Sequence, residues 1–228
     1  ITIAGTETNV VSNVRVMRNG EEITTKYYEV TLKNGTLTIT PKDTAIVVTG
    51  DSDSKKYDGT ALEVASDGFT VSGALASGDR IEATVSGSIT DVGSTETTVS
   101  NVKVYNSNDE DVTASYSGIT TEKGTLTITK RTVILTSASD TKEYDGTALT
   151  NSNVTASGDG FVSGEGATYT VTGSQTIEGS SKNKFTYELN AGTKAGNYEI
   201  TKIEGTLTVT PKDTAIVVTG DSDSKKYD

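Results

Sequence analysis

The chain has no cysteine, no histidine and no tryptophan among its 228 residues, and only two prolines. Without cysteine there is no disulfide framework and no thiolate chemistry. Without histidine there is no Ser-His-Asp triad and no histidine-bearing zinc site. Only carboxylate chemistry is left for an enzyme, and the acidic residues lie in repeated turn segments, so we expect no catalysis.

Apolar residues are also scarce, at 32% hydrophobic and 6% aromatic. A single large core would be thin for this length, so several small cores are the better expectation. No apolar run approaches the roughly 20 residues that span a bilayer, which argues against membrane insertion. The net charge of −11 and the pI near 4.5 argue against nucleic acid as a partner, because phosphates do not attract an acidic surface.

Threonine, in contrast, is abundant, with 42 residues. Its β-branched side chain suits the pleated surface of a strand. Apolar residues alternate with threonine or charged residues in 81–85, 125–129 and 185–189, as strands with one buried face require, and a further strand is expected at 45–49. No long stretch carries a helical stripe. The sequence therefore predicts an all-β protein.

Two sequence markers recur. Gly-Thr-Leu-Thr occurs at Gly35, Gly124 and Gly205. Lys-x-Tyr-Asp-Gly-Thr-Ala-Leu occurs around Tyr57 and Tyr144, and its first residues return at Tyr227. Residues 41–58 are identical to 211–228. Such self-similarity at a fixed period is the signature of a tandem array.

These markers divide the chain into four parts. Residues 1–40 are expected to be the C-terminal part of one repeat, 41–129 and 130–210 two complete β repeats, and 211–228 the start of the next. The joints contain no Gly/Ser linker, and two of them carry a proline (Pro41 and Pro211). Short joints of this kind predict a semi-rigid rod.

The same residues resemble the MBG/YDG-type repeats of bacterial surface adhesins. The resemblance covers nearly the whole chain. In the first repeat its motifs are Tyr57-Asp58-Gly59-Thr60, Ser72-Gly73, Gly78-Asp79, Asp91-Val92-Gly93 and Tyr116 ahead of Gly124. In the second they are Tyr144-Asp145-Gly146-Thr147, Ser163-Gly164 (matched to Ser72-Gly73) and Ala195-Gly196-Asn197-Tyr198 ahead of Gly205.

The resemblance implies a mostly β module of the extracellular part of large surface proteins, without known catalysis. The expected fold is a tandem of small immunoglobulin-like β-sandwiches, with a β-grasp-like variant carrying a short helix as the alternative. The expected function is a structural stalk of a secreted adhesin, cell-wall anchored through a region outside this chain, with neighbouring repeats as partners.

Two features look like sites. The Tyr-Asp-Gly motif (Tyr57, Asp58, Gly59 and Tyr144, Asp145, Gly146) is interpreted as framework, because Asp-Gly is a turn signal and the tyrosine can bury its ring. Closely spaced carboxylates offer weak calcium candidates, and no other cofactor is expected. These candidates are Asp51, Asp53, Asp221 and Asp223.

Two alternative functions remain open. The repeats can themselves bind host or microbial glycan or protein, which exposed tyrosines such as Tyr27 and Tyr28, or Tyr105 and Tyr116, would favour. They can also self-assemble, with exposed strand edges pairing into filaments.

Overall fold

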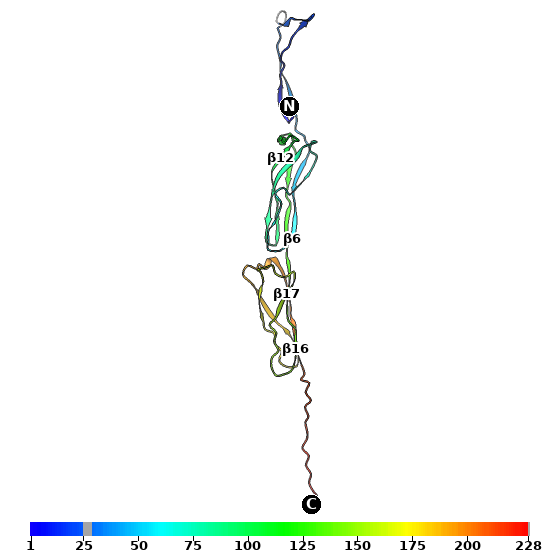
Figure 1. Ribbon diagram of the computed structural model, residues 1–228, viewed down its shortest axis with the longest axis vertical. Coiled ribbons are helices and arrows are strands. Elements are labelled where there is room, and N and C mark those ends of the chain that lie inside the picture. The colour runs from blue at the N-terminus through cyan, green and yellow to red at the C-terminus, as the bar shows by residue number, and fades with distance from the viewer. Residues whose placement is uncertain (25–28, 228) are drawn as a thin grey trace. The chain divides into compact units, whose positions relative to one another are not determined.

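A computed structural model describes residues 1–24 and 29–227 (Figure 1). The protein is nearly all β, with 48% of its residues in strands and 3% helical. No helix of seven or more residues occurs in the described part; the 3₁₀ turns are η1 (Thr113–Ser115) and η2 (Ala195–Asn197). The all-β prediction is confirmed.

None of the helical segments within residues 1–24 and 29–227 combines the length and the apolar character needed to cross a bilayer.

The chain forms two compact units. Unit 1 comprises Ile1–Lys55 and Ala61–Ile128, and unit 2 comprises Lys56–Thr60 and Thr129–Asp228. The segment Lys56–Thr60, which holds the first Tyr-Asp-Gly-Thr motif, therefore belongs to unit 2. The four-part division of the sequence stays a prediction.

The described strands of unit 1 run from residue 5 to residue 129, and the last residues of two of them, Lys56 and Thr129, are assigned to unit 2. The strands are β1 (Gly5–Asn9), β2 (Met17–Arg18), β3 (Glu21–Glu22), β4 (Gly35–Ile39), β5 (Ile46–Gly50), β6 (Asp53–Lys56), β7 (Leu62–Glu63), β8 (Phe69–Ser72), β9 (Arg80–Ser86), β10 (Ser88–Ile89), β11 (Gly93–Glu96), β12 (Thr98–Tyr105), β13 (Ile119–Glu122) and β14 (Thr125–Thr129).

The described residues of unit 2 form eight strands. They are β15 (Arg131–Ser137), β16 (Asp140–Glu143), β17 (Val154–Gly158), β18 (Ala167–Val171), β19 (Gly179–Asn183), β20 (Phe185–Leu189), β21 (Tyr198–Ile203) and β22 (Gly205–Thr210). The strands expected at 45–49, 81–85, 125–129 and 185–189 are confirmed as β5, β9, β14 and β20.

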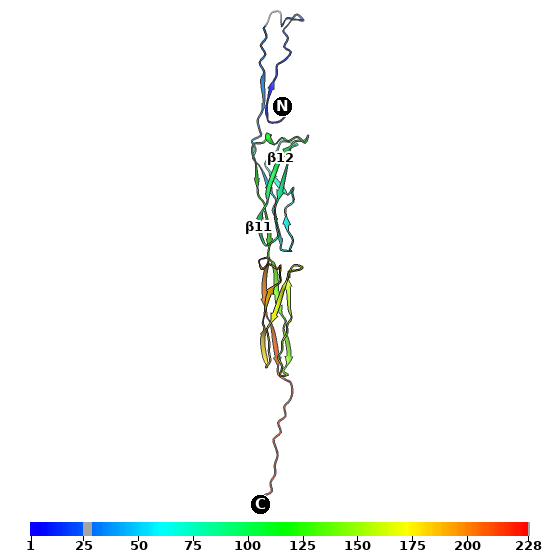
Figure 2. The same ribbon diagram turned by 90° about the vertical axis from the view of Figure 1, so that its left-hand side faces the viewer.

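Both units repeat one strand order. In unit 1 the three-stranded sheets are β13-β5-β8 and β11-β14-β6, and β12 pairs with β9; Figure 2 labels β11 and β12, which follow one another but enter different sheets. In unit 2 the matching sheets are β21-β15-β17 and β19-β22-β16, and β20 pairs with β18. The pairings β13–β5, β15–β21 and β16–β22 are parallel.

The core of each unit follows from alternation along the central strands. Side chains alternate between the two faces of a strand, so every second residue is buried. Unit 1 buries Ile46, Val48, Val104, Leu126 and Ile128 almost completely. Unit 2 buries Val133, Leu135, Phe185, Leu207 and Val209 to the same degree.

Gly124 and Gly205, the glycines of the Gly-Thr-Leu-Thr marker, lie where two backbones meet. A Cβ on Gly124 would overlap the carbonyl oxygens of Gly50 and Asp51, and one on Gly205 those of Ser137 and Ala138. Only glycine allows this approach, which explains why the marker begins with it.

Candidate functional site

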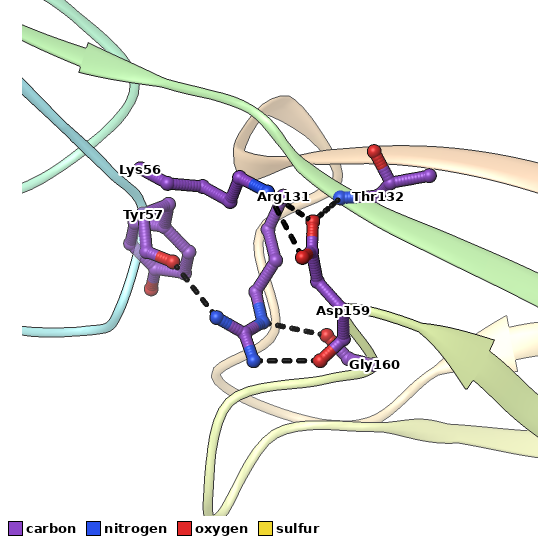
Figure 3. Close-up of polar contacts among 6 residues, drawn as sticks. All are labelled: Lys56, Tyr57, Arg131, Thr132, Asp159 and Gly160. Atoms are coloured by element: carbon purple, nitrogen blue, oxygen red, sulfur yellow. Dashed lines mark hydrogen bonds and ion pairs between the residues drawn. The ribbon is translucent and has the colours of Figure 1, made fainter.

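The candidate site lies in unit 2, where the segment Lys56–Thr60 contacts three pieces of the fold. Arg131 opens β15, and Asp159 and Gly160 form the turn after β17, where Gly158 and Gly160 have positive φ of 77° and 71°. Tyr198 opens β21 directly after η2. The polar part of this arrangement is drawn in Figure 3.

An ion pair holds the first residue of the segment. Lys56 Nζ donates to both carboxylate oxygens of Asp159, at 2.9 and 2.8 Å, and the Thr132 N–H donates to the same carboxylate at 3.1 Å (Figure 3). These hydrogen bonds lower the pKa of Asp159, and the bond from Lys56 contributes most. Both side chains are partly solvated, so the pair orients the segment more than it stabilises the fold.

Arg131 joins the segment to the turn with three bonds (Figure 3). Its Nε donates to the Gly160 carbonyl at 2.7 Å and its Nη2 to the Asp159 carbonyl at 2.6 Å. Its Nη1 makes a longer contact of 3.5 Å with the Tyr57 carbonyl. The planar guanidinium, which carries five donors, can satisfy several carbonyls at once.

Tyr57 and Tyr198 share one carboxylate. Tyr57 Oη donates to Glu165 Oε1 at 2.6 Å, and Tyr198 Oη donates to Glu165 Oε2 at 2.7 Å. The two rings meet edge to face, with centroids 5.6 Å apart. Burial, with the Glu165 carboxylate adding to it, raises the pKa of Tyr198 to about 12.

The turn after Tyr57 is closed by its own aspartate. Asp58 Oδ1 accepts from the Thr60 N–H at 2.9 Å and from the Thr60 hydroxyl at 2.7 Å, and Gly59 has a φ of 82°. Asp145, Gly146 and Thr147 repeat the same bonds at 2.9 and 2.8 Å and the same φ. In the motif, the aspartate caps a turn and glycine supplies the left-handed conformation.

The second motif differs in its tyrosine. The Tyr57 side chain is 5% exposed, whereas that of Tyr144 is 42% exposed. Tyr144 borders a hollow of about 260 Å³, together with Ile177, Glu178, Pro211 and Lys212. The backbone is nevertheless equivalent, because the Tyr57 N–H donates to the Thr129 carbonyl and the Tyr144 N–H to the Thr210 carbonyl, both at 2.9 Å.

No family model, curated protein or solved structure matches the chain.

The calcium candidates are not brought together. Asp53 Oδ1 caps the Ser54 N–H at 2.7 Å, and Asp223 Oδ1 does the same for Ser224 at 2.8 Å. Asp51 and Asp53 line a small hollow with Glu63, and Asp221 is exposed. Over residues 1–24 and 29–227, no three acidic side chains are grouped so as to hold a metal ion.

The tyrosines proposed as an exposed binding cluster are distributed differently. Tyr116 is buried, and Tyr105 is half-buried with the Arg80 guanidinium over its ring, 5.2 Å from the centroid. Tyr27 and Tyr28 lie outside the described residues.

Sequence reasoning missed the carboxylate that the tyrosines use, because it matched Ser163-Gly164 to Ser72-Gly73. That match is wrong. The structural counterpart of Ser163-Gly164-Glu165 is Ser77-Gly78-Asp79: the Asp79 N–H donates to the Ala76 carbonyl as the Glu165 N–H does to that of Val162. Either acid accepts a hydrogen bond from a core tyrosine, Tyr116 in unit 1 and Tyr198 in unit 2.

Proposed function

We propose that the chain is a run of non-catalytic spacer repeats of the MBG/YDG type from a secreted bacterial cell-surface adhesin. The repeats carry tension between an anchored region and a distal binding region.

The observation that carries this proposal is the parallel pairing of the first two strands of unit 2 with its last two strands. The chain runs through β15 into β16 and leaves through β22, and β16 and β22 pair in parallel from Asp140↔Leu207 to Glu143↔Thr210. β15 likewise pairs in parallel with β21 over six residues. When two such strands are pulled from opposite ends, the load acts along the ladder and all of its hydrogen bonds resist together.

Unit 1 supports the same reading. Its central strand β5 pairs in parallel with β13, from Ile46↔Ile119 to Thr49↔Glu122. β14, its last strand, lies between β6 and β11. A repeat that serves as a spacer needs this resistance and a small core, and it needs no pocket.

Ligand binding by the repeats is the second candidate, and the tyrosines weigh against it. Tyr57, Tyr116 and Tyr198 are 3–8% exposed, with their hydroxyls committed to carboxylates, so they are core residues of their units. Aromatic residues that bind ligands are instead presented at the surface.

Single-molecule pulling tests the proposal directly. Because the sequence has no native cysteine, handles attach only at the cysteines that are introduced. Handles introduced as K130C and K212C load unit 2 along its parallel strands. Handles introduced as T170C and T186C, which lie opposite each other at exposed positions of the antiparallel β18–β20 pair, pull that pair apart one bond at a time. We expect a clearly higher unfolding force in the first geometry at equal loading rate; equal forces, or a lower one, would remove the basis of the proposal.

A further inference from the structure

Unit 2 contains a hollow of about 400 Å³ that is lined mostly by uncharged polar residues. One wall is the segment that follows Leu149, and the other is the segment that leads from the end of β18 to Gln175. The lining residues are Thr150, Asn151, Ser152, Val171, Thr172, Gly173 and Ser174. The volume is that of a small-molecule site, and all of these residues belong to unit 2.

In unit 1 the two corresponding segments are joined to each other. They pair as β7 and β10, and just beyond that pair the Val64 N–H donates to the Gly87 carbonyl at 3.2 Å. The sequence shows the correspondence: the first segment follows Thr-Ala-Leu in both units, and Val-Ser-Gly-Ser at 85–88 matches Val-Thr-Gly-Ser at 171–174. The hollow is therefore a difference between two otherwise equivalent pieces of sheet.

In unit 2 the two segments separate after a single bridge, Leu149↔Gln175. Asn151 and Gly173 are the counterparts of Val64 and Gly87, yet in the described part of the chain they make no backbone hydrogen bond to each other. The N–H of Asn151 and the carbonyl of Gly173 are thereby left on opposite walls of the hollow.

Asn183 holds one of these walls. It occupies the position of Thr97, and its Nδ2 donates to the carbonyls of Asn151 and Ala138, both at 2.9 Å. Its side chain is fully buried, and within residues 1–24 and 29–227 its Oδ1 is the one buried side-chain oxygen or nitrogen that has no hydrogen-bond partner. This oxygen lies against the other wall, because a Cβ built on Gly173 would overlap it. A buried acceptor without a donor is unfavourable, so a ligand hydroxyl that reaches it is favoured.

The lining selects the chemistry of the ligand. No charged side chain lines the hollow among the described residues, and the net charge of −11 disfavours an anion. A hard cation requires carboxylates, which this lining does not supply. Hydroxyl groups both donate and accept, so they match a wall that offers an N–H and a carbonyl together with four hydroxyl side chains. These side chains are Thr150, Ser152, Thr172 and Ser174.

We infer that the hollow between Asn151 and Gly173 binds a neutral, hydroxyl-rich small molecule, of the size of a mono- or disaccharide. Its hydroxyls accept from the Asn151 N–H and donate to the Gly173 carbonyl and to Asn183 Oδ1. The site adds an activity to the spacer function, which requires no ligand, and it involves none of the core tyrosines.

A titration of the isotopically labelled whole chain, followed by nuclear magnetic resonance, tests the site. The probes are four free sugars: D-glucose, D-galactose, D-mannose and N-acetyl-D-glucosamine. We expect at least one of them to give saturable shifts of the amide signals of 150–152 and 171–174. The corresponding residues of unit 1, 63–65 and 85–88, should not shift, because their segments are joined.

Two variants test whether the hollow itself is the site. Ser174→Phe fills it from one wall and should weaken sugar binding at least about tenfold, because the aromatic ring displaces the ligand. Ser88→Phe is the matched control, since Ser88 is the exposed counterpart in unit 1, and it should leave the affinity unchanged. The double variant S137G/N183T copies the Gly50–Thr97 pair of unit 1 and should also abolish binding. Both changes are needed, because in unit 1 a Cβ on Gly50 would lie 2.5 Å from the Thr97 hydroxyl.

The outcomes separate cleanly. No saturable shift with any of the four sugars, equal shifts in the two units, or an affinity that Ser174→Phe leaves unchanged would overturn the inference. The titration of the native chain does not depend on any variant folding, so a poorly folded S137G/N183T would not leave the question open.

Discussion

The rings of Tyr57 and Tyr198 meet edge to face at 5.6 Å, and their hydroxyls end on the two oxygens of the same carboxylate, that of Glu165. Tyr57 comes from the first sequence repeat, and Tyr198 and Glu165 come from the second. This three-residue cluster incorporates the Tyr-Asp-Gly-Thr motif into unit 2.

Removal of the Tyr57 hydroxyl should weaken unit 2. Tyr57→Phe keeps the ring but leaves Glu165 Oε1 without its donor, so we expect the free energy of unfolding of unit 2 to fall by about 1–3 kcal/mol. Chemical denaturation followed by tyrosine fluorescence measures it. Tyr144→Phe is the matched control, because that ring is exposed, and it should change stability by less than about 0.5 kcal/mol. Equal effects of the two variants would contradict the assigned role of the motif tyrosine.

Alkaline pH should destabilise unit 2 through Tyr198. Its folded pKa, raised to about 12, lies above the ordinary value of about 10, so the folded state holds the proton more tightly than the unfolded state. The resulting stabilisation is complete below pH 10 and is lost as the pH rises toward 12. Phenolate absorbance and unfolding midpoints between pH 9 and 12 follow it. In Tyr198→Phe this component should vanish; an unchanged slope would show that another group causes it.

Glycine should be indispensable at the start of the marker strand in both units, and dispensable in β4. Gly124→Ala and Gly205→Ala place a Cβ against backbone carbonyls, which we expect to cost about 2–3 kcal/mol or to prevent folding of the affected unit. Gly35→Ala is the control: its Cβ would meet only the Asn9 side chain, at 3.7 Å. Thermal unfolding that ranks Gly35→Ala with the other two would refute the close-approach argument.

The strands of this protein could be predicted from sequence, whereas the site could not. Alternation in 125–129 and 185–189 reports which face of a strand is buried, and that is a local property. The bond between Tyr57 and Glu165 joins residues 108 positions apart, and no spacing rule connects them. The acid is Asp79 in one repeat and Glu165 in the other, so matching identical residues missed the equivalence that the turn geometry makes plain.

A buried hydroxyl of unit 2 should matter as much as an apolar core residue. Ser137 Oγ donates to the Asn183 carbonyl at 2.6 Å and accepts from the Gly205 N–H at 3.0 Å. Ser137→Ala leaves both backbone groups unpaired in a site that water does not reach, so we expect a loss of about 1–3 kcal/mol. Ser180→Ala is the control, because its hydroxyl bonds Thr208 at an exposed position. Similar denaturation midpoints for the two variants would contradict the prediction.

The central claim is that consecutive repeats act as a stiff spacer, and small-angle scattering of the whole chain in solution tests it most directly. We expect the profile of an elongated particle with the cross-section of one small β domain, unchanged by a calcium chelator. A globular or freely bending profile for the native chain would contradict the stiff-spacer claim. A profile that becomes extended only when calcium is present would show instead that the stiffness depends on calcium bound at Asp51 and Asp53.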